Sequence, residues 1–96
     1  MKPVRQQIQE LRRNSGVQVN GRRYVNYAAF MWYCRQSDHP HQLERKQQKY
    51  PAHFITVNDQ PFVTEDYARY VFIQHNAARL QQALQSGHTA EKGGIS

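Results

Sequence analysis

Hydrophobic residues recur with a helical period near both ends of this chain. Val4, Ile8 and Leu11 form one apolar stripe on a helix expected over Val4–Arg13. A longer helix is expected over Glu65–Ser86. Its apolar residues are Tyr67, Tyr70, Val71, Ile73, Ala77, Leu80 and Leu84. These segments are the clearest helices that the pattern predicts.

Two segments between these helices have the pattern of β-hairpins. In Val17–Val25, β-branched residues flank Asn20-Gly21, a pair that accepts the positive φ angles of a type I′ turn. Further along, Phe54–Val57 is expected to be a strand, Asn58–Pro61 a turn and Phe62–Val63 a short returning strand. Because an isolated hairpin is marginally stable, the two are expected to pair into one small sheet.

Each hairpin is followed by a residue that suits a helix N-cap. Asn26 is expected to cap a helix from Tyr27 to about Gln36, and Thr64 is expected to cap the long helix. The core side of the first of these helices is expected to comprise Ala29, Phe30, Tyr33 and Cys34, with Trp32 near its edge.

A further helix is expected over His41–Lys49. Leu43 and Tyr50 are its apolar anchors, so most of its circumference is expected to remain exposed. Such a helix either lies inert on the surface or presents its basic side to a partner.

The two hairpin-to-helix units resemble each other in sequence. The stretch VNGRRYVN at 19–26 is followed 38 positions later by VNDQPFVT at 57–64. This similarity fits either an internal duplication or convergence on residues that suit such junctions. We expect an α+β fold, with a small sheet built from two β-hairpins and packed with three or four helices, the last of them long. Residues 1–86 are expected to form a single compact domain, and residues 87–96 a flexible tail.

Positive charge is concentrated in the first half of the chain. The net charge is +6 overall, and residues 1–49 hold ten Lys and Arg against three acidic residues, a net +7. Residues 50–96 hold three basic and four acidic residues, a net −1. Such a distribution favours a polyanionic partner, of which nucleic acid is the most common. An acidic protein partner and a merely solvated basic surface are the alternatives.

Two groups of residues are the candidates for binding DNA. Arg22 and Arg23 follow the tight hairpin turn, where they reach a phosphate backbone or protect an edge strand against aggregation. Gln and Arg side chains can read adenine and guanine edges, so the helix over 41–49 is a candidate recognition helix. The complete set of predicted DNA-binding residues is Arg22, Arg23, Arg35, Gln42, Arg45, Lys46 and Lys49.

A candidate dimer interface lies on the long helix. Ala77, Leu80 and Leu84 fall three and four positions apart and are flanked by glutamines, as in the seam of a coiled coil. Packing of these residues on their own domain is the alternative. A homodimer would suit a DNA-binding protein, because its twofold symmetry matches palindromic sites.

The sequence contains few of the patterns that accompany catalysis or metal binding. His39-Pro40-His41 lacks a further ligand pair, and we interpret it as a loop at the start of a helix. The chain has neither a nucleophile elbow nor a Gly-rich phosphate loop, so we expect no enzyme activity, no cofactor and no metal. Cys34 is expected to be a small buried apolar residue. Without a long apolar run or a secretory signal pattern, we expect a cytoplasmic protein with no membrane contact.

Several motifs occur in a characteristic order over Val17–Leu84. They are the hairpin VQVNGRRYV, the helix NYAAFMWYC, the His-led basic segment HPHQLERKQQK, and FVTEDYARYVF at the opening of the long helix. In this order the chain resembles phage regulatory proteins of the Rha and KilA-N type. It departs from them where Asp66-Tyr67 replaces the family's usual Asp-Gly-Phe, and where the helix after the first hairpin lacks the family's usual turn residues.

The resemblance implies a regulator from a phage or prophage. Its partner would be DNA or a regulatory protein. In the first case the basic hairpin and the short helix bind DNA and regulate transcription. In the second the chain is an antirepressor or inhibitor that binds and inactivates another protein, such as a transcriptional repressor. A structural or host-interfering phage product is a third alternative.

Overall fold

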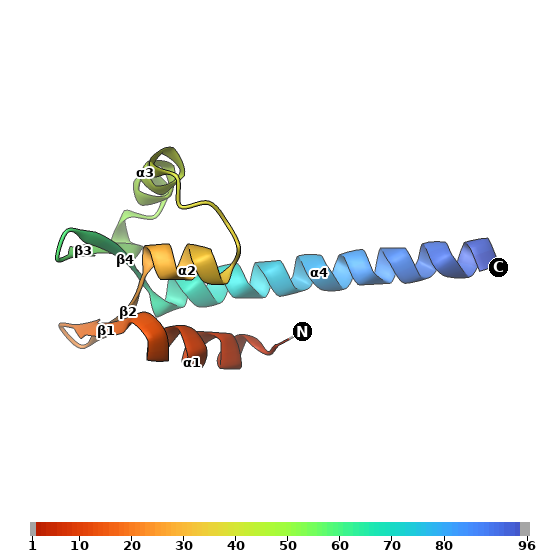
Figure 1. The fold of residues 1–96 in the computed structure, drawn as a ribbon, viewed down its shortest axis with the longest axis horizontal. Coiled ribbons are helices and arrows are strands. Elements are labelled where there is room, and N and C mark those ends of the chain that lie inside the picture. Colours follow the sequence, from red (N-terminus) through yellow and green to blue (C-terminus); the bar gives the residue numbers. More distant parts are fainter. Residues whose placement is uncertain (1, 95–96) are drawn as a thin grey trace.

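The computed structural model describes the backbone of residues 2–94 and the side chains of residues 2–85. In this part of the chain, helices and a four-stranded antiparallel sheet form an α+β fold (Figure 1). The elements are α1 (Val4–Ser15), β1 (Gly16–Val19), β2 (Arg22–Asn26), α2 (Tyr27–Tyr33), α3 (Pro40–Lys49), the 3-10 helix η1 (Pro51–His53), β3 (Phe54–Val57), β4 (Gln60–Thr64) and α4 (Glu65–Gly94). The predicted fold class, two hairpins in one sheet with a long final helix, is confirmed.

The two hairpins join through their second strands, giving the strand order β1-β2-β4-β3. At the junction Val25 lies opposite Val63, with Tyr24 opposite Thr64. Both valines are fully buried, so the centre of the sheet is also a centre of the core. Pairing between hairpins therefore supplies the apolar burial that a single hairpin lacks.

Both hairpins turn through two residues with positive φ. These are Asn20 (φ 51°) and Gly21 (φ 78°) in the first, and Asn58 (φ 51°) and Asp59 (φ 63°) in the second. The predicted second turn, over 58–61, is too long, because Gln60 and Pro61 already belong to β4. Asn and Asp tolerate the left-handed region, so two residues close the turn without a glycine.

The core lies between the sheet and helices α1, α2 and α4. The ring of Phe30 on α2 meets that of Phe72 on α4 edge to face, with centroids 5.4 Å apart. Ile8 and Leu11 are buried in the same cluster, as their spacing predicts. Burial of one such aliphatic side chain contributes about 1.5–3 kcal/mol, so this stripe holds α1 firmly on the body of the protein.

An ion pair also joins α1 to the start of α4. Arg12 donates two hydrogen bonds to the carboxylate of Glu65, at 2.7 and 2.8 Å. Glu65 is buried, and its charge is balanced by this two-pronged contact and by its place in the first turn of α4.

Helix α2 ends three residues before the predicted end at Gln36. Arg35 adopts a left-handed conformation (φ 57°), and its amide donates to the carbonyl of Trp32 while the amide of Gln36 donates to that of Met31. This pair of bonds is a Schellman motif, which satisfies the last carbonyls of the helix. The prediction failed because the motif usually uses glycine, and this chain has arginine there.

Helix α4 has two apolar sides. Thr64 caps it by accepting a hydrogen bond from the amide of Tyr67 (3.1 Å), as predicted, and its first turns pack against β2, β4 and α1. The rest of the helix extends away from the other elements (Figure 1). Of its apolar residues, Tyr67, Ala68 and Phe72 are buried, whereas Tyr70, Ile73, Leu80 and Leu84 are exposed. The tail expected at 87–96 involves residues whose side chains lie outside the described part, and it stays a prediction.

The two halves of the chain follow the same plan, 38 positions apart. Strands β1 and β3, strands β2 and β4, and the first residues of α2 and α4 all differ by this number. The equivalent valines 25 and 63 pair with each other, so a local twofold axis passes between them. The caps are equivalent too, because Asn26 accepts from the amide of Ala29 as Thr64 does from that of Tyr67. The similarity seen in the sequence is thus a repeated structural unit.

Candidate functional site

Helix α3 is placed at the edge of the molecule rather than in its core. It begins at Pro40, whose fixed φ suits the first turn, and the Nδ1 atom of His39 accepts from the amide of His41 (3.2 Å). Among its described side chains none is buried, and Leu43 is the half-buried anchor. The helix packs mainly on η1 and runs steeply across the directions of α2 and α4 (Figure 1). It is therefore an exposed helix with most of its surface available.

One side of α3 combines cationic and amide side chains around a hollow. Gln42, Arg45, Lys46 and Lys49 recur at i, i+3, i+4 and i+7, so they share one side of the helix. With Tyr50 and Tyr67 they line a hollow of about 380 Å³. None of the described residues that line it is acidic. We call these four residues of α3 its cationic side.

Two lysines of the cationic side are held against aromatic rings. Lys46 donates to the hydroxyl of Tyr27 (3.1 Å), and its Nζ atom lies 5.3 Å from the centroid of that ring. Lys49 lies 5.4 Å from the centroid of Tyr50. Cation–π contacts of this kind position an ammonium group without cancelling its charge. The two lysines are thus partly fixed before any ligand arrives.

The twofold plan of the chain shows what is unusual about α3. At an offset of 38, Lys46 and Lys49 occupy the places that Ile8 and Leu11 hold on α1. Those two residues are buried, and α1 packs against α2, α4 and β2. Burying lysines at these places would cost a large desolvation free energy. Helix α3 therefore does not pack into the core as α1 does, and the hollow beside it stays open. The scaffold is repeated, but its second copy exchanges a packed helix for a cationic one.

The predicted hairpin pair, Arg22 and Arg23, is divided between the two faces of the sheet, because consecutive strand residues point in opposite directions. Arg22 reaches η1, where its Nη1 atom donates to the carbonyl of Ala52 (3.4 Å). Arg23 lines a different hollow together with Arg12 and Glu65. The two arginines are therefore not a single clamp in this fold, and only Arg22 contacts the connection that follows α3.

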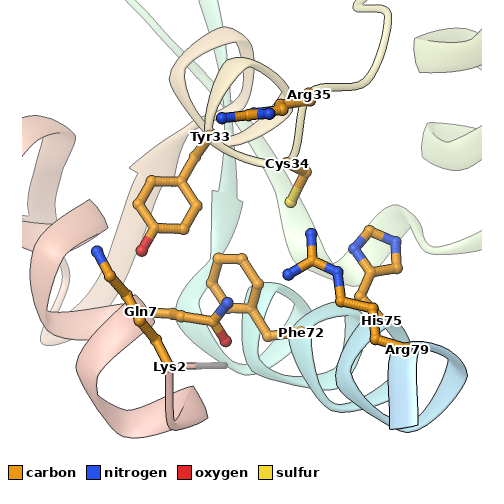
Figure 2. Close-up of a pocket in the computed structure, with 8 residues that line it drawn as sticks. All are labelled: Lys2, Gln7, Tyr33, Cys34, Arg35, Phe72, His75 and Arg79. Carbon is orange, nitrogen blue, oxygen red and sulfur yellow. The ribbon is translucent and has the colours of Figure 1, made fainter. Parts of the chain in front are cut away.

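The remaining predicted residue, Arg35, belongs to another hollow of about 460 Å³ between the start of α1, the end of α2 and α4. Its lining residues are Lys2, Gln7, Tyr33, Cys34, Arg35, Phe72, His75 and Arg79 (Figure 2). We call it the α2–α4 hollow. His75 and Arg79 were not among the residues predicted from the sequence. Their spacing of four on one helix was the available signal, but only the fold brings them to the hollow that Arg35 also lines.

The predicted dimer residues are all exposed. Leu80 is 55% exposed and Leu84 is 66% exposed, so these two residues do not pack on their own domain. Tyr70 and Ile73, at 49% and 52%, extend the same stripe toward the sheet. With Ala77 these residues alternate three and four positions apart over 70–84, which is the spacing of a coiled-coil seam. Tyr70 and Ile73 were expected only as apolar residues of the long helix and were not assigned to the seam.

Other chemistry has little support in the described residues. Within them no cluster of three or more metal-ligating side chains occurs, and the rings of His39 and His41 stack on each other at 5.3 Å. Burial raises the pKa of the Cys34 thiol to about 11, even though Arg79 and Lys46 lower it. The thiol is thus protonated at neutral pH. Among the described helices none has the length and apolar character that crossing a membrane requires.

Comparisons with known proteins found no counterpart of this chain: no family model matches it, and neither a curated protein nor a solved structure is significantly similar to it.

Proposed function

We propose that this protein is a small DNA-binding regulator and that the cationic side of α3 contacts the DNA. The observation that carries the proposal is the replacement of a core-facing apolar side, as on α1, by Gln42, Arg45, Lys46 and Lys49 around one hollow. Positive charge on an exposed helix suits the phosphate backbone. The adjacent amide and guanidinium groups suit base edges in the major groove.

The residues of the cationic side have different roles in this proposal. Gln42 and Arg45 are exposed, so they are free to reach bases. Lys46 is held by Tyr27 and acts as a fixed charge that orients the helix on the backbone. Lys49 lies at the end of α3 and contacts phosphate. Arg22, beside η1, supplies a further phosphate contact.

The resemblance to phage regulatory proteins supports the regulatory part of the proposal. In that resemblance the basic segment 39–49 stands where the second helix of a helix-turn-helix-like unit is expected. Helix α3 does follow α2 at a steep angle, as in such units, although the connection over 34–39 is longer than the usual three or four residues (Figure 1).

We further propose that two copies of the chain pair through the exposed stripe of α4. The stripe has seam spacing, and its flanking residues Gln74, Asn76 and Gln81 are uncharged. Two identical faces therefore meet without like-charge repulsion, whereas a charged partner helix would find no complementary residues there. A dimer presents two α3 helices to DNA, which matches the symmetry of palindromic sites.

Fluorescence anisotropy with labelled duplex DNA tests the role of α3. The double variant Arg45→Ala/Lys49→Ala should raise the Kd at least about tenfold at constant salt. One base or phosphate contact of this type accounts for about 1–3 kcal/mol, and 1.4 kcal/mol is a factor of ten.

The matched control is Arg5→Ala/Arg13→Ala, which removes the same charge from exposed positions on α1. It should change the Kd by less than about threefold, since those residues lie outside the hollow. Equal losses in the two variants would show that net charge alone attracts the DNA, and the proposal for α3 would then be wrong.

A second candidate function is an antirepressor that binds another protein. Trp32 favours it, because this side chain is 82% exposed on α2, and exposed tryptophans often anchor protein interfaces. A pull-down from a host lysate with and without nuclease separates the two candidates. Retention of a single repressor protein after nuclease, lost in Trp32→Ala, would favour the antirepressor over DNA binding.

A further inference from the structure

We propose that the α2–α4 hollow binds a small phosphorylated ligand, which the guanidinium groups of Arg79 and Arg35 contact from the two sides of Cys34. This site is separate from the cationic side of α3 and does not depend on DNA binding. Its volume of about 460 Å³ lies within the range of small-molecule sites. Arg79 reaches toward the sulfur of Cys34 beside His75, while Arg35 lies across the end of α2 (Figure 2).

The charges around the hollow are unbalanced in favour of an anion. Among residues 2–85, neither the side chain of Arg35 nor that of Arg79 makes a hydrogen bond or an ion pair. The carboxylate of Glu10, which contacts two of the lining residues, is engaged by Lys2 at 3.0 Å and by the hydroxyl of Tyr33. No acidic side chain is among the described residues that line the hollow. Two unpaired guanidinium groups are the usual means of holding a phosphate.

The backbone of Arg35 is a second, independent observation. Its left-handed conformation (φ 57°) is the one in which glycine is strongly preferred after a helix. An L-residue with a long side chain is strained there. An arginine at this position therefore lowers stability, and strained positions of this kind cluster at ligand sites. A side chain that binds a ligand accounts for its presence.

His75 lines the hollow beside Arg79 and is neutral in the absence of a ligand. The side-chain amide nitrogen of Gln36 (Nε2) lies 3.0 Å from Nε2 of His75. An amide nitrogen can only donate, so this ring nitrogen of His75 accepts the hydrogen bond. Burial lowers the pKa of His75, and the charges of Arg79 and Lys46 lower it further. A bound phosphate would offset those charges. The imidazole would then gain a proton at Nε2, with the side-chain amide of Gln36 turning its oxygen toward that nitrogen, and would add a third positive group to the site.

Isothermal titration calorimetry of the full chain with pyrophosphate and with adenosine diphosphate, at constant ionic strength, tests the proposal. The wild type should bind at least one of these probes saturably at a single site. Arg79→Gln should weaken that binding about tenfold or more, because a charge-assisted contact is lost. Arg13→Gln, an exposed arginine of α1, is the control and should leave the affinity unchanged.

The variant Arg35→Gly separates binding from folding. It should weaken the probe about tenfold or more while raising the unfolding midpoint by about 4–8 °C, since glycine relieves the strain. The absence of saturable binding to the wild type, or an equal loss in Arg13→Gln, would overturn the proposal. If Arg35→Gly and Arg79→Gln weaken DNA binding but leave the probes unaffected, the hollow holds a DNA phosphate and the small-ligand site is rejected.

Discussion

Lys46 is the residue at which the two halves of this chain differ most in chemistry. Its counterpart on α1, Ile8, is buried, whereas Lys46 is half-buried beside the ring of Tyr27 and the sulfur of Met31, which lies 3.5 Å from its Nζ atom. The charge of Lys46 also lowers the pKa of His75. One side chain thus lines the hollow of α3 and acts electrostatically on the α2–α4 hollow.

The charged residues could be identified from the sequence, but not all of their neighbours could. The four residues of the cationic side share a helix face, so charge and periodicity were sufficient to group them. Arg22 and Arg23 were predicted as a pair, although the alternation of a strand already sends them to opposite faces. Arg79 could not be assigned to Arg35, because only the fold brings α4 to the end of α2.

His75 gives a pH dependence that can be checked at the residue scale. Its pKa is lowered in the folded state, so the unfolded chain binds more protons below about pH 6.5. The contribution of neutral His75 to stability is therefore present above pH 6.5 and is lost as the pH falls toward its folded-state pKa. Urea unfolding of the wild type and of His75→Gln between pH 8 and pH 5 measures the effect.

In His75→Gln the loss of unfolding free energy between pH 6.5 and pH 5 should be smaller than in the wild type. The other histidines are unchanged in both proteins, so the difference between the two curves reports His75. Parallel curves over that interval would contradict the environment described for this residue.

At the scale of the elements, α4 was located from the sequence but its two sides were not distinguished. Tyr67, Val71 and Phe72 face the body of the protein, and the stripe through Ile73 and Leu80 faces away. A helix that is apolar on two sides gives no clear period, so the sequence did not show which residues are buried. The end of α2 was missed for a different reason, because an arginine occupies the position where glycine normally signals a cap.

The exposed stripe of α4 predicts how the chain associates. Leu80→Glu places a charge in the proposed seam, so it should convert a dimer into a monomer. Because Leu80 is exposed in the single chain, its unfolding as a monomer should change by less than about 0.5 kcal/mol. Sedimentation equilibrium of the wild type and of the variant measures the two masses.

Gln82, an exposed glutamine two positions after Leu80, provides the control for that experiment. Gln82→Glu adds the same charge on the same helix, outside the stripe, and should leave the dimer intact. A monomeric mass for the wild type, or a dimeric mass for Leu80→Glu, would reject the seam.

At the scale of the whole molecule, the fold is one architectural unit used twice with different surfaces. Each half is a helix, a hairpin and a capped helix, and the equivalent valines meet at the centre of the sheet. In the first half, α1 packs against the core through Ile8 and Leu11. In the second half, the corresponding helix α3 carries Lys46 and Lys49 at the equivalent places. The repeat was visible in the sequence. The pairing of Val25 with Val63 was needed to show that the two halves are related by a twofold axis, and therefore that α3 is the counterpart of α1.

In the proposed function, the cationic side of α3 binds the DNA backbone and bases. The most direct test of this binding is the dependence of DNA affinity on salt, measured by anisotropy between 50 and 200 mM for the wild type, Arg45→Ala/Lys49→Ala and Arg5→Ala/Arg13→Ala. The wild type should lose affinity steeply, because phosphate contacts release counterions. The α3 variant should show a log–log slope smaller by about 0.9 for each phosphate contact removed, and the α1 control should retain the wild-type slope. A wild-type affinity that does not change with salt, or slopes that are the same in the wild type and the α3 variant, would contradict the account.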